Sequence, residues 1–284
     1  MFGSELRWVP EFGPLERAAI RVYGSLSAPT VTRYLRFKYF ALRFFRRQGI
    51  QPDKVLDFGC AFGAFGFALA RRDRYARVFL YDKSSAAAGK CRTIARRGGY
   101  SNVTVLDEES LARDSGFSLI LLISVLEHVE DDLGLLERLR EKLAPEGYLF
   151  VMVPAAHGHE CSEKDHYLGH ARPGYGRTAL LDLLESAGFQ VVVEPAYAPR
   201  DPGRALALLR SAYTSLTRSR DHPLLDFQSL PRLRLWKKAA LAVLWPFYRL
   251  ALELDAAYAG MRSDRVALIA RAKASASADS PGGG

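Results

Sequence analysis

Two glycines that follow an apolar run give the first indication of chemistry in this sequence. Residues 54–58 (Lys-Val-Leu-Asp-Phe) fit the end of a buried strand, and Gly59 and Gly63 flank a turn in which the backbone can lie close to a bound molecule. The dinucleotide fingerprint Gly-x-Gly-x-x-Gly would need glycines at positions 61 and 64, which are both alanine. The stretch therefore predicts a turn that binds another cofactor; the alternative is a tight strand-to-helix turn that holds no ligand.

A carboxylate at the end of the next apolar run could serve the same ligand. Asp82 follows residues 78–81 (Val-Phe-Leu-Tyr) and lies 25 positions after Asp57. In a doubly wound fold, an acid at the end of the second strand can accept hydrogen bonds from both hydroxyls of a ribose. We therefore predict that Asp82 binds a ribose, the alternative being an ordinary aspartate that caps the following helix.

Histidines are concentrated between residues 128 and 170. Five of the six lie there, namely His128, His157, His159, His166 and His170. Their His-x-His and His-x-x-x-His spacings could chelate a metal ion on a strand or a helix. The three cysteines stand at unrelated spacings and complete no Cys/His ligand set, so we expect neither a metal site nor a disulfide framework.

Alternating strand and helix patterns predict an α/β fold around these residues. Apolar runs alternate with helical periods across short connections, which is typical of a parallel sheet covered by helices. The predicted strands are 54–58, 77–81, 103–106, 117–123, 147–153 and 189–194, and the predicted helices are 63–72, 84–97, 131–143 and 177–187. We therefore expect a doubly wound, mostly parallel sheet.

Several blocks in this order resemble class I S-adenosylmethionine-dependent methyltransferases. Residues 57–63 (Asp-Phe-Gly-Cys-Ala-Phe-Gly) resemble the first motif, usually Asp-x-Gly-Cys-Gly-x-Gly, with Ala61 at the middle glycine. Residues 126–129 (Leu-Glu-His-Val) look like the fourth motif of the ubiquinone/menaquinone-biosynthesis-like and type 11 or type 23 groups. Residues 143–154 resemble the family's Leu-x-Pro-Gly-Gly turn and fifth strand, with Glu146 replacing the first glycine. The resemblance covers residues from about 50 to 194.

This resemblance implies a Rossmann-like sheet of seven strands, the last of which, residues 266–272, is antiparallel. It implies S-adenosyl-L-methionine as cofactor, S-adenosyl-L-homocysteine as product, and no metal. Arg33 or Arg36 would hold the cofactor carboxylate, and Asp107 with Glu108 would stand near the adenine amino group. The predicted cofactor-binding residues are Arg33, Asp57, Gly59, Cys60, Ala61, Gly63, Asp82, Lys83, Asp107, Glu108 and Ser124.

The residues after the fourth strand narrow the predicted reaction. Methyltransferases that act on adenine or amide nitrogen commonly carry Asn/Asp/Ser-Pro-Pro-Tyr there, whereas residues 124–128 are Ser-Val-Leu-Glu-His. We therefore predict transfer to a hydroxyl, or less readily to a carbon, of a small or lipid-like acceptor. His128 is the first candidate for a general base, since an unperturbed histidine has a pKa of about 6.5; the alternative is a hydrogen-bonded histidine that shapes the pocket. The resemblance also implies that His166 and His170 face the acceptor.

The basic charge of the chain and two departures from the family motifs each suggest an alternative function. The formal net charge of +9, with a pI near 9.5, favours an anionic partner or simply a solvated basic surface. Arginine clusters within 43–47 and 71–74 suggest an RNA-modifying or nucleic-acid-binding methyltransferase, although no recognition module accompanies them. We rank nucleic acid below a small-molecule acceptor. Ala61 and Glu146 suggest a non-catalytic scaffold that binds the cofactor.

We expect the chain to consist of four parts. They are a helical cap at 1–50, the methyltransferase domain at 51–194 plus 264–273, a helical lid at 195–263 and a disordered tail at 274–284. Within the cap we expect a loosely held lead-in at 1–14 and helices at 15–26 and 31–45. Within the lid we expect helices at 204–219 and 232–258 around a loop at 221–231. Pro246 should kink or restart the apolar helix at 232–258, which would close an apolar pocket or rest on an anionic membrane. Because no secretion signal or long apolar run is present, we expect a cytoplasmic protein, free or peripheral at the membrane. The sequence does not indicate the oligomeric state of the protein.

Overall fold

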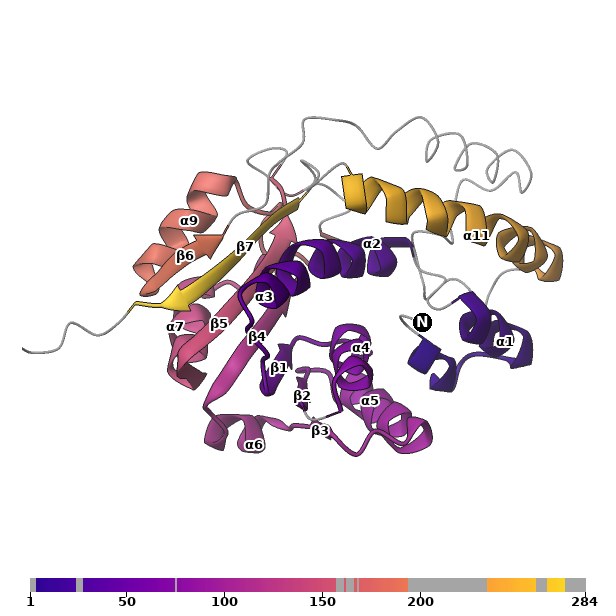
Figure 1. The fold of residues 1–284 in the computed structure, drawn as a ribbon, viewed down its shortest axis with the longest axis horizontal. Coiled ribbons are helices and arrows are strands. Elements are labelled where there is room, and N and C mark those ends of the chain that lie inside the picture. The colour runs from indigo at the N-terminus through magenta and orange to yellow at the C-terminus, as the bar shows by residue number, and fades with distance from the viewer. Residues whose placement is uncertain are drawn as a thin grey trace, which may run out of the picture.

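A seven-stranded sheet forms the centre of the computed structural model, which describes residues 4–23, 28–74, 76–156, 161, 166–167, 169–193, 234–258 and 265–273 (Figure 1). The strand order is β3-β2-β1-β4-β5-β7-β6, and β7 pairs antiparallel with both of its neighbours. The strands are β1 (Lys54–Phe58), β2 (Arg77–Tyr81), β3 (Val103–Val105), β4 (Phe117–Ile123), β5 (Leu143–Pro154), β6 (Phe189–Val193) and β7 (Arg265–Ala272). The predicted fold class, including the antiparallel last strand, is confirmed.

Helices cover both faces of the sheet because its strands are apolar on both sides. Within β4, Leu119 and Leu121 belong to the core cluster under one set of helices, whereas Ile120 and Leu122 belong to the cluster under the other. The helices are α1 (Pro14–Tyr23), α2 (Ala28–Phe37), α3 (Arg43–Arg47), α4 (Ala64–Arg72), α5 (Ser85–Gly98), α6 (Glu108–Arg113), α7 (Asp132–Lys142), α9 (Arg177–Ser186) and α11 (Leu235–Tyr258). The core cluster on the Leu119 face includes residues of α2, α4, α5 and α11, and the cluster on the Ile120 face includes residues of α6, α7 and α9.

The first residues are more firmly packed than the Gly- and Pro-rich composition predicted. A 3-10 helix spans Ser4–Trp8, and Leu6, Val9 and Phe12 are all at least 97% buried. The expectation of a loosely held lead-in is therefore wrong for residues 4–14. The physical reason is a spacing of three residues between these apolar side chains, which lets one side of the segment bury itself against the core cluster under α4 and α5.

The apolar run predicted as one helix at 31–45 consists of three consecutive helical segments. A π-helical segment, η2 (Lys38–Leu42), connects α2 to α3. Phe37 and Phe45 are buried in the core, so this face of the cap packs against the domain. Figure 1 shows α11 lying along α2, and the two helices are in contact.

Helix α11 is the described part of the predicted lid. Pro246 lies inside a helix that continues from Leu235 to Tyr258, so the predicted restart is not found. Trp245 and Leu252 are buried in the core, whereas Trp236 and Phe247 are exposed. No helix among the described residues is long and apolar enough to span a membrane. The predicted helix at 204–219, the loop at 221–231 and the tail at 274–284 lie outside the described residues.

Candidate active site

The turn between β1 and α4 has the tight backbone that its glycines predicted. Gly59 adopts a left-handed conformation (φ +70°), and a Cβ placed on it would lie 2.5 Å from Cγ2 of Val125. Ala61, where the family usually has glycine, is also left-handed (φ 49°), and its carbonyl accepts from the Cys91 thiol. The chain therefore keeps the left-handed turn despite the alanine, at a steric cost that glycine would avoid.

Asp57 is buried at the end of β1, beneath this turn. Its Oδ2 accepts a hydrogen bond from the Gly66 N–H in the first turn of α4, at 2.9 Å. Burial, assisted by the nearby Asp82 carboxylate, raises the pKa of Asp57 to about 7, although the Gly66 hydrogen bond acts in the opposite direction. Asp57 thus ties the strand to the start of the helix, and it also lines the cleft described below.

Asp82 lies at the end of β2, where both of its oxygens accept backbone hydrogen bonds. Oδ2 accepts from the Ala61 N–H at 2.8 Å, and Oδ1 accepts from the Ser84 N–H at 2.9 Å. The carboxylate therefore connects the glycine turn to the start of α5. Each oxygen has a second lone pair, so both can still accept from a ribose hydroxyl. Lys83, the next predicted residue, has an exposed side chain.

The acidic pair after β3 stands at the same edge of the sheet. Asp107 is the N-cap of α6, and its Oδ1 accepts from the Ser110 N–H at 2.9 Å. This helix was not predicted. Burial raises the pKa of Tyr81, and the nearby carboxylates of Glu108 and Asp82 raise it further. The acidic residues predicted to bind the ribose (Asp82) and to stand near the adenine (Asp107 and Glu108) therefore follow adjacent strands of the sheet.

A cleft of about 130 Å³ opens between the glycine turn, α2 and the end of β4. Arg33, Asp57 and Ser124 line it together with Cys60. Burial lowers the pKa of the Arg33 guanidinium to about 10, the charge of Arg265 adds to this effect, and Glu127 opposes it. Arg33 Nε is buried and has no hydrogen-bond partner among the described residues. Of the two candidate arginines, only Arg33 is among the described residues that line the cleft.

Two histidines, His128 after β4 and His170 before α9, form a second cluster with Glu127. His128 Nδ1 donates to the Gly169 carbonyl at 3.1 Å, and the His128 and His170 rings meet edge to face with centroids 4.7 Å apart. Ligand atoms of Glu127, His128 and His170 all lie within 4.8 Å of one another, a spacing that could also suit a divalent metal ion. His166 is exposed and, among the described residues, stands outside this cluster. His157 and His159 lie outside the described residues.

Two charged residues of the site were not assigned a role from the sequence. Glu127 is 1% exposed, burial raises its pKa, and its Oε2 has no hydrogen-bond partner among the described residues. Arg265 donates to Ser124 Oγ at 2.9 Å. The sequence did contain a signal for the position of Arg265. The last strand was predicted to be antiparallel, and the first residue of such a strand must lie at the edge where the parallel strands end.

An ion pair and hydrogen bonds connect the segment after His170 to the segment that runs from His128 into α7. Arg172 donates to Asp132 Oδ2 at 2.5 Å and to the Val129 carbonyl at 2.7 Å. The Tyr175 hydroxyl donates to the same Asp132 oxygen at 2.7 Å. These bonds fix the segment that carries Gly169 and His170 over the segment that carries His128, so the position of the cluster follows from contacts outside it.

Residues 32–194, more than half of the chain, match the model of the type 23 family, described as a methyltransferase domain. The chain belongs to this methyltransferase family. Over 118 residues it is 31% identical to a ubiquinone biosynthesis O-methyltransferase of Histophilus somni (strain 2336), a match that covers 38% of this chain and 49% of the relative. The chain thus matches only about half the length of that relative.

Solved methyltransferase structures share the fold. A putative sarcosine dimethylglycine methyltransferase from Galdieria sulphuraria is similar with a TM-score of 0.53 and 13% identity, over 92% of this chain and 99% of that one. Coclaurine N-methyltransferase bound to N-methylheliamine and S-adenosylhomocysteine is similar with a TM-score of 0.50 and 18% identity, over 81% and 68% of the two chains. At such identities these similarities support the fold alone.

Family and fold thus agree on a methyltransferase domain of the S-adenosylmethionine-dependent kind. The residues present fit the cofactor, because the buried Nε of Arg33 lacks a partner among the described residues and the Gly59 turn leaves no room for a side chain. The cleft of about 130 Å³ accommodates only the amino-acid end of such a molecule, and the ribose and adenine would lie along the edge at Asp82 and Asp107. A larger cavity at the opposite edge of the sheet does not touch these residues.

Proposed function

We propose that the protein transfers the methyl group of S-adenosylmethionine to a hydroxyl oxygen, or less readily to a carbon, of a small or lipid-like acceptor. The observation that carries this proposal is the orientation of His128, which lies four residues after Ser124, a residue that lines the cofactor cleft. Because its Nδ1 is directed at the Gly169 carbonyl, that nitrogen carries the proton, and Nε2 keeps a lone pair that can accept one. A nitrogen of this kind can remove the proton from an acceptor hydroxyl.

When bound, S-adenosylmethionine supplies a methyl group on a positively charged sulfur, which is a good leaving group. The chain would bind and orient it: Arg33 would pair with the carboxylate, and Asp82 would accept from the ribose hydroxyls. Holding acceptor and methyl group in line can contribute roughly 7–11 kcal/mol to catalysis. The carboxyl group of Glu127, within 4.8 Å of the histidine nitrogens, can stabilise the charge that forms when His128 takes the proton.

The nature of the acceptor rests on three supporting features. The matched relative from Histophilus somni is named as an O-methyltransferase of ubiquinone biosynthesis. Residues 124–128 lack the Pro-Pro pair typical of enzymes that methylate adenine or amide nitrogen. Helix α11, which lies along the arginine-bearing helix α2, carries exposed apolar side chains such as Trp236 and Phe247. An apolar phenol or alcohol therefore fits better than a nucleobase.

Helix α11 is also our candidate for peripheral contact with an anionic membrane, in a protein that we expect in the cytoplasm. Its apolar exposed side chains could enter the interface, and lysines at positions 237 and 238 stand near its start. Co-sedimentation with vesicles tests this directly. Binding to anionic but not to neutral vesicles, lost in a Lys237→Glu/Lys238→Glu variant, supports contact; binding to neither excludes it.

Methyl transfer can be tested with purified protein and S-adenosylmethionine labelled on the methyl group. The acceptors should include phenols and alcohols with and without an alkyl chain, carbon nucleophiles, and a generic RNA. We expect His128→Gln to lower turnover of the best hydroxyl acceptor by about 100-fold or more, the usual contribution of a general base, while affinity for S-adenosylhomocysteine stays unchanged.

His166→Gln provides the matched control, because the side chain of His166 is exposed and lies outside the cluster. We expect its turnover to stay close to that of the wild-type protein. Methylation of RNA alone would contradict the proposed acceptor class. Tight cofactor binding without turnover of any acceptor would favour a non-catalytic scaffold.

A further inference from the structure

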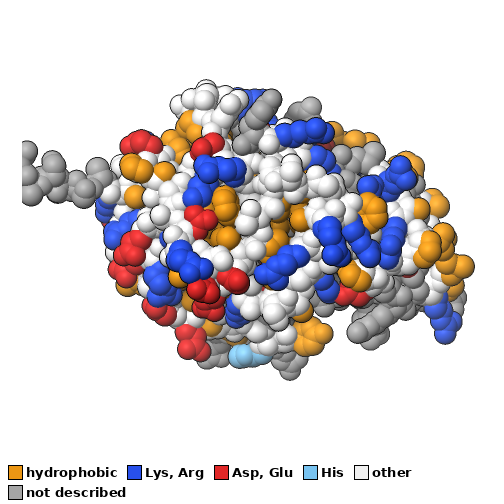
Figure 2. Space-filling view, turned by 90° about the horizontal axis from the view of Figure 1, so that it is seen from below, with side chains coloured by type: hydrophobic (Ala, Val, Ile, Leu, Met, Phe, Trp, Pro, Cys, Tyr) orange, Lys and Arg blue, Asp and Glu red, His pale blue; other side chains and the backbone are white. Residues whose placement is uncertain are grey.

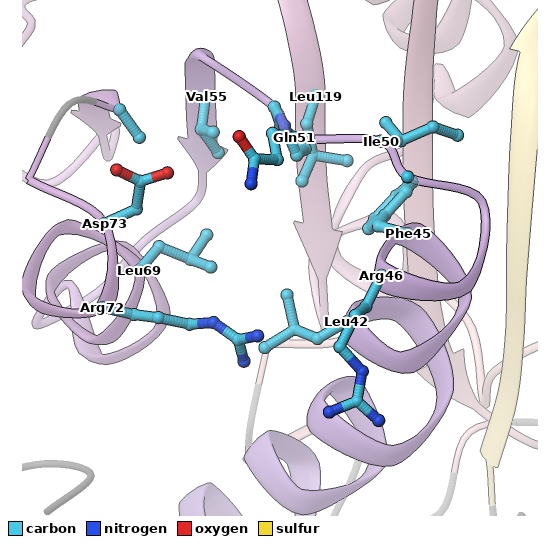
Figure 3. A pocket seen from close by; sticks show the side chains of 13 residues that line it. Leu42, Phe45, Arg46, Ile50, Gln51, Val55, Leu69, Arg72, Asp73 and Leu119 are labelled. Atoms are coloured by element: carbon cyan, nitrogen blue, oxygen red, sulfur yellow. The ribbon is translucent and has the colours of Figure 1, made fainter.

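A cavity of about 500 Å³ lies at the edge of the sheet opposite the cofactor cleft. Figure 3 shows it between α3, the chain that leads into β1, and the end of α4. Val55, near the start of β1, lines its floor, whereas Gly59, directly after the same strand, lines the cofactor cleft. The two hollows are therefore separate, and the larger one has a volume typical of small-molecule sites.

The walls of this cavity are mostly apolar, and arginines line one side of it. Leu42, Ile50 and Leu69 face it, and Figure 3 shows the guanidinium groups of Arg46 and Arg72 on the same side. An adjoining hollow of about 260 Å³ is lined by Leu42, by the same two arginines, and also by Arg43 and Arg47. The two hollows thus share Leu42 and the two arginines at their rim.

The four arginines of this rim carry charge that no described side chain compensates. Arg43, Arg46, Arg47 and Arg72 are exposed, and none of their guanidinium groups takes part in an ion pair or hydrogen bond among the described residues. Lys38, which also lines the smaller hollow, is paired with Glu253 at 2.6 Å. Like charges gathered at one rim repel one another, so an anion bound there would gain from all four.

The positions of the polar groups define how a ligand would lie. Asp73 and Gln51 stand on the side of the cavity opposite Arg46 and Arg72 (Figure 3). A carboxylate at Asp73 would repel an anion, so an acidic group belongs at the arginine rim and not at the far side. The apolar walls between the two sides suit a hydrocarbon or other apolar body.

We propose that this cavity binds one molecule of an anionic amphiphile, whose carboxylate or phosphate meets Arg46 and Arg72 and whose apolar body lies against Leu42, Ile50 and Leu69. Arginine suits both acids because its planar guanidinium can donate two parallel hydrogen bonds. The apolar walls favour this ligand over RNA. Figure 2 shows basic side chains scattered over one face, with acidic ones gathered toward its left end. Such surface charge could attract RNA, but it offers no site for an apolar body.

The test measures binding of four probes to the full chain: dodecanoate, dodecyl phosphate, dodecanol and inorganic phosphate. Calorimetry below the micelle concentration gives each affinity. We expect both acids to bind, dodecanol to bind more weakly, and inorganic phosphate to bind most weakly. In an Arg46→Gln/Arg72→Gln variant the affinity for both acids should fall by about tenfold or more, the scale of a lost hydrogen bond to a charged group, while affinity for dodecanol stays the same.

A matched control changes the charge equally at a different place. Arg96→Gln/Arg97→Gln removes two exposed arginines from the last turn of α5 and should leave all four affinities unchanged. Both double variants should bind S-adenosylhomocysteine like the wild-type protein, which shows that they fold. Equal losses in the two variants, or inorganic phosphate that binds as tightly as dodecyl phosphate, would overturn the proposal. Binding of anionic vesicles or RNA without binding of the free acids would overturn it as well.

Discussion

Arg33 and Arg265 donate to the same oxygen, Oγ of Ser124, at 3.1 and 2.9 Å. The two arginines come from α2 and from the start of β7, and they meet at the end of β4, where Ser124 has a left-handed backbone (φ 57°). Burial lowers the pKa of Arg33, and repulsion between the two guanidinium groups at one neutral oxygen lowers it further. An anion in the adjoining cleft would relieve that repulsion, which supports our proposal that Arg33 binds the cofactor carboxylate.

Replacing Arg33 by glutamine should weaken cofactor binding through this carboxylate. We expect affinity for S-adenosylhomocysteine to fall by about 1.5–3 kcal/mol, the range for a lost hydrogen bond to a charged group, measured by calorimetry. 5′-Methylthioadenosine lacks the carboxylate and should bind both proteins alike. Arg113→Gln, which removes an exposed arginine paired with Glu109, is the charge control and should change neither affinity. An equal loss for both ligands would show that Arg33 supports the fold and not the carboxylate.

Replacing Asp82 by asparagine should weaken binding of the ribose. The amide keeps one acceptor oxygen but replaces the other with a donor, so one ribose hydroxyl loses its partner and affinity should fall by about 1.5–3 kcal/mol. An analogue without the two ribose hydroxyls should bind both proteins equally in calorimetry. Asp131→Asn is the matched control, because Asp131 also accepts from a backbone N–H, that of Gly134, at the start of α7. Unchanged affinity in Asp82→Asn would remove Asp82 from the site.

The strands at this edge could be predicted well because each is a short apolar run that ends at a glycine, an acid or a serine. The predicted bounds of 54–58, 77–81 and 117–123 are those of β1, β2 and β4. Helix α6 escaped prediction because its six residues are too few to show a helical period. The sequence nevertheless contained a signal for the start of this helix. Asp107 is a favourable N-cap residue, and its side chain accepts a hydrogen bond from the N–H of Ser110, three residues later.

The site could be predicted where it is built by one continuous segment, and not where distant segments meet. The nearness of the glycine turn to Asp82, to which Ala61 donates a hydrogen bond, could be predicted because each stands at the end of a recognisable strand. The approach of Arg265 to Arg33, and of Glu127 to His170, depends on strand pairing and on the Arg172–Asp132 ion pair, which spacing alone does not reveal. The unpaired arginine rim formed by α3 and α4 likewise joins two clusters that are separate in the sequence.

The raised pKa of Asp57 should make the stability of the protein depend on pH. The folded state binds this proton more tightly than the unfolded state, because the pKa rises from 3.8 to about 7. The contribution is therefore fully present below about pH 4 and is lost as the pH rises through about 7, by roughly 4 kcal/mol at most. Urea unfolding should show the wild-type protein losing stability relative to Asp57→Asn over that range.

Asp107 supplies a control of opposite sign for this measurement. Its hydrogen bonds with Ser110 hold the pKa of the exposed carboxylate below 3.8. Its contribution is present above that value and is lost as the pH falls, so the wild-type protein should gain stability relative to Asp107→Asn as the pH rises from strongly acidic values. The same slope for both variants would mean that other groups dominate the pH dependence.

Adding one methyl group to a glycine should reveal how closely the cofactor turn packs. Gly59→Ala and Gly49→Ala both place alanine at a left-handed position, with φ of +70° and +68°. A Cβ at Gly49 meets no atom within 4 Å, so that variant should lose only about 1–2 kcal/mol of stability. At Gly59 the methyl group meets Val125, which should cost about 1–3 kcal/mol more and also weaken S-adenosylhomocysteine binding. Equal costs in thermal unfolding would contradict the packing of this turn.

Two tryptophans on α11 test whether this part of the predicted lid is anchored to the domain. Trp245 is 0% exposed and belongs to the same core cluster as Phe37 and Phe150, whereas Trp236 is 49% exposed. Truncating a buried aromatic side chain leaves a cavity, so Trp245→Ala should lower the free energy of unfolding by about 3–5 kcal/mol. Trp236→Ala should change it by no more than about 0.5 kcal/mol, the usual scale for a surface position. Denaturant unfolding of both variants gives the comparison. Similar small losses in the two would mean that α11 does not pack on the domain as the structure shows, and the lid would then have to be held by other parts of the chain.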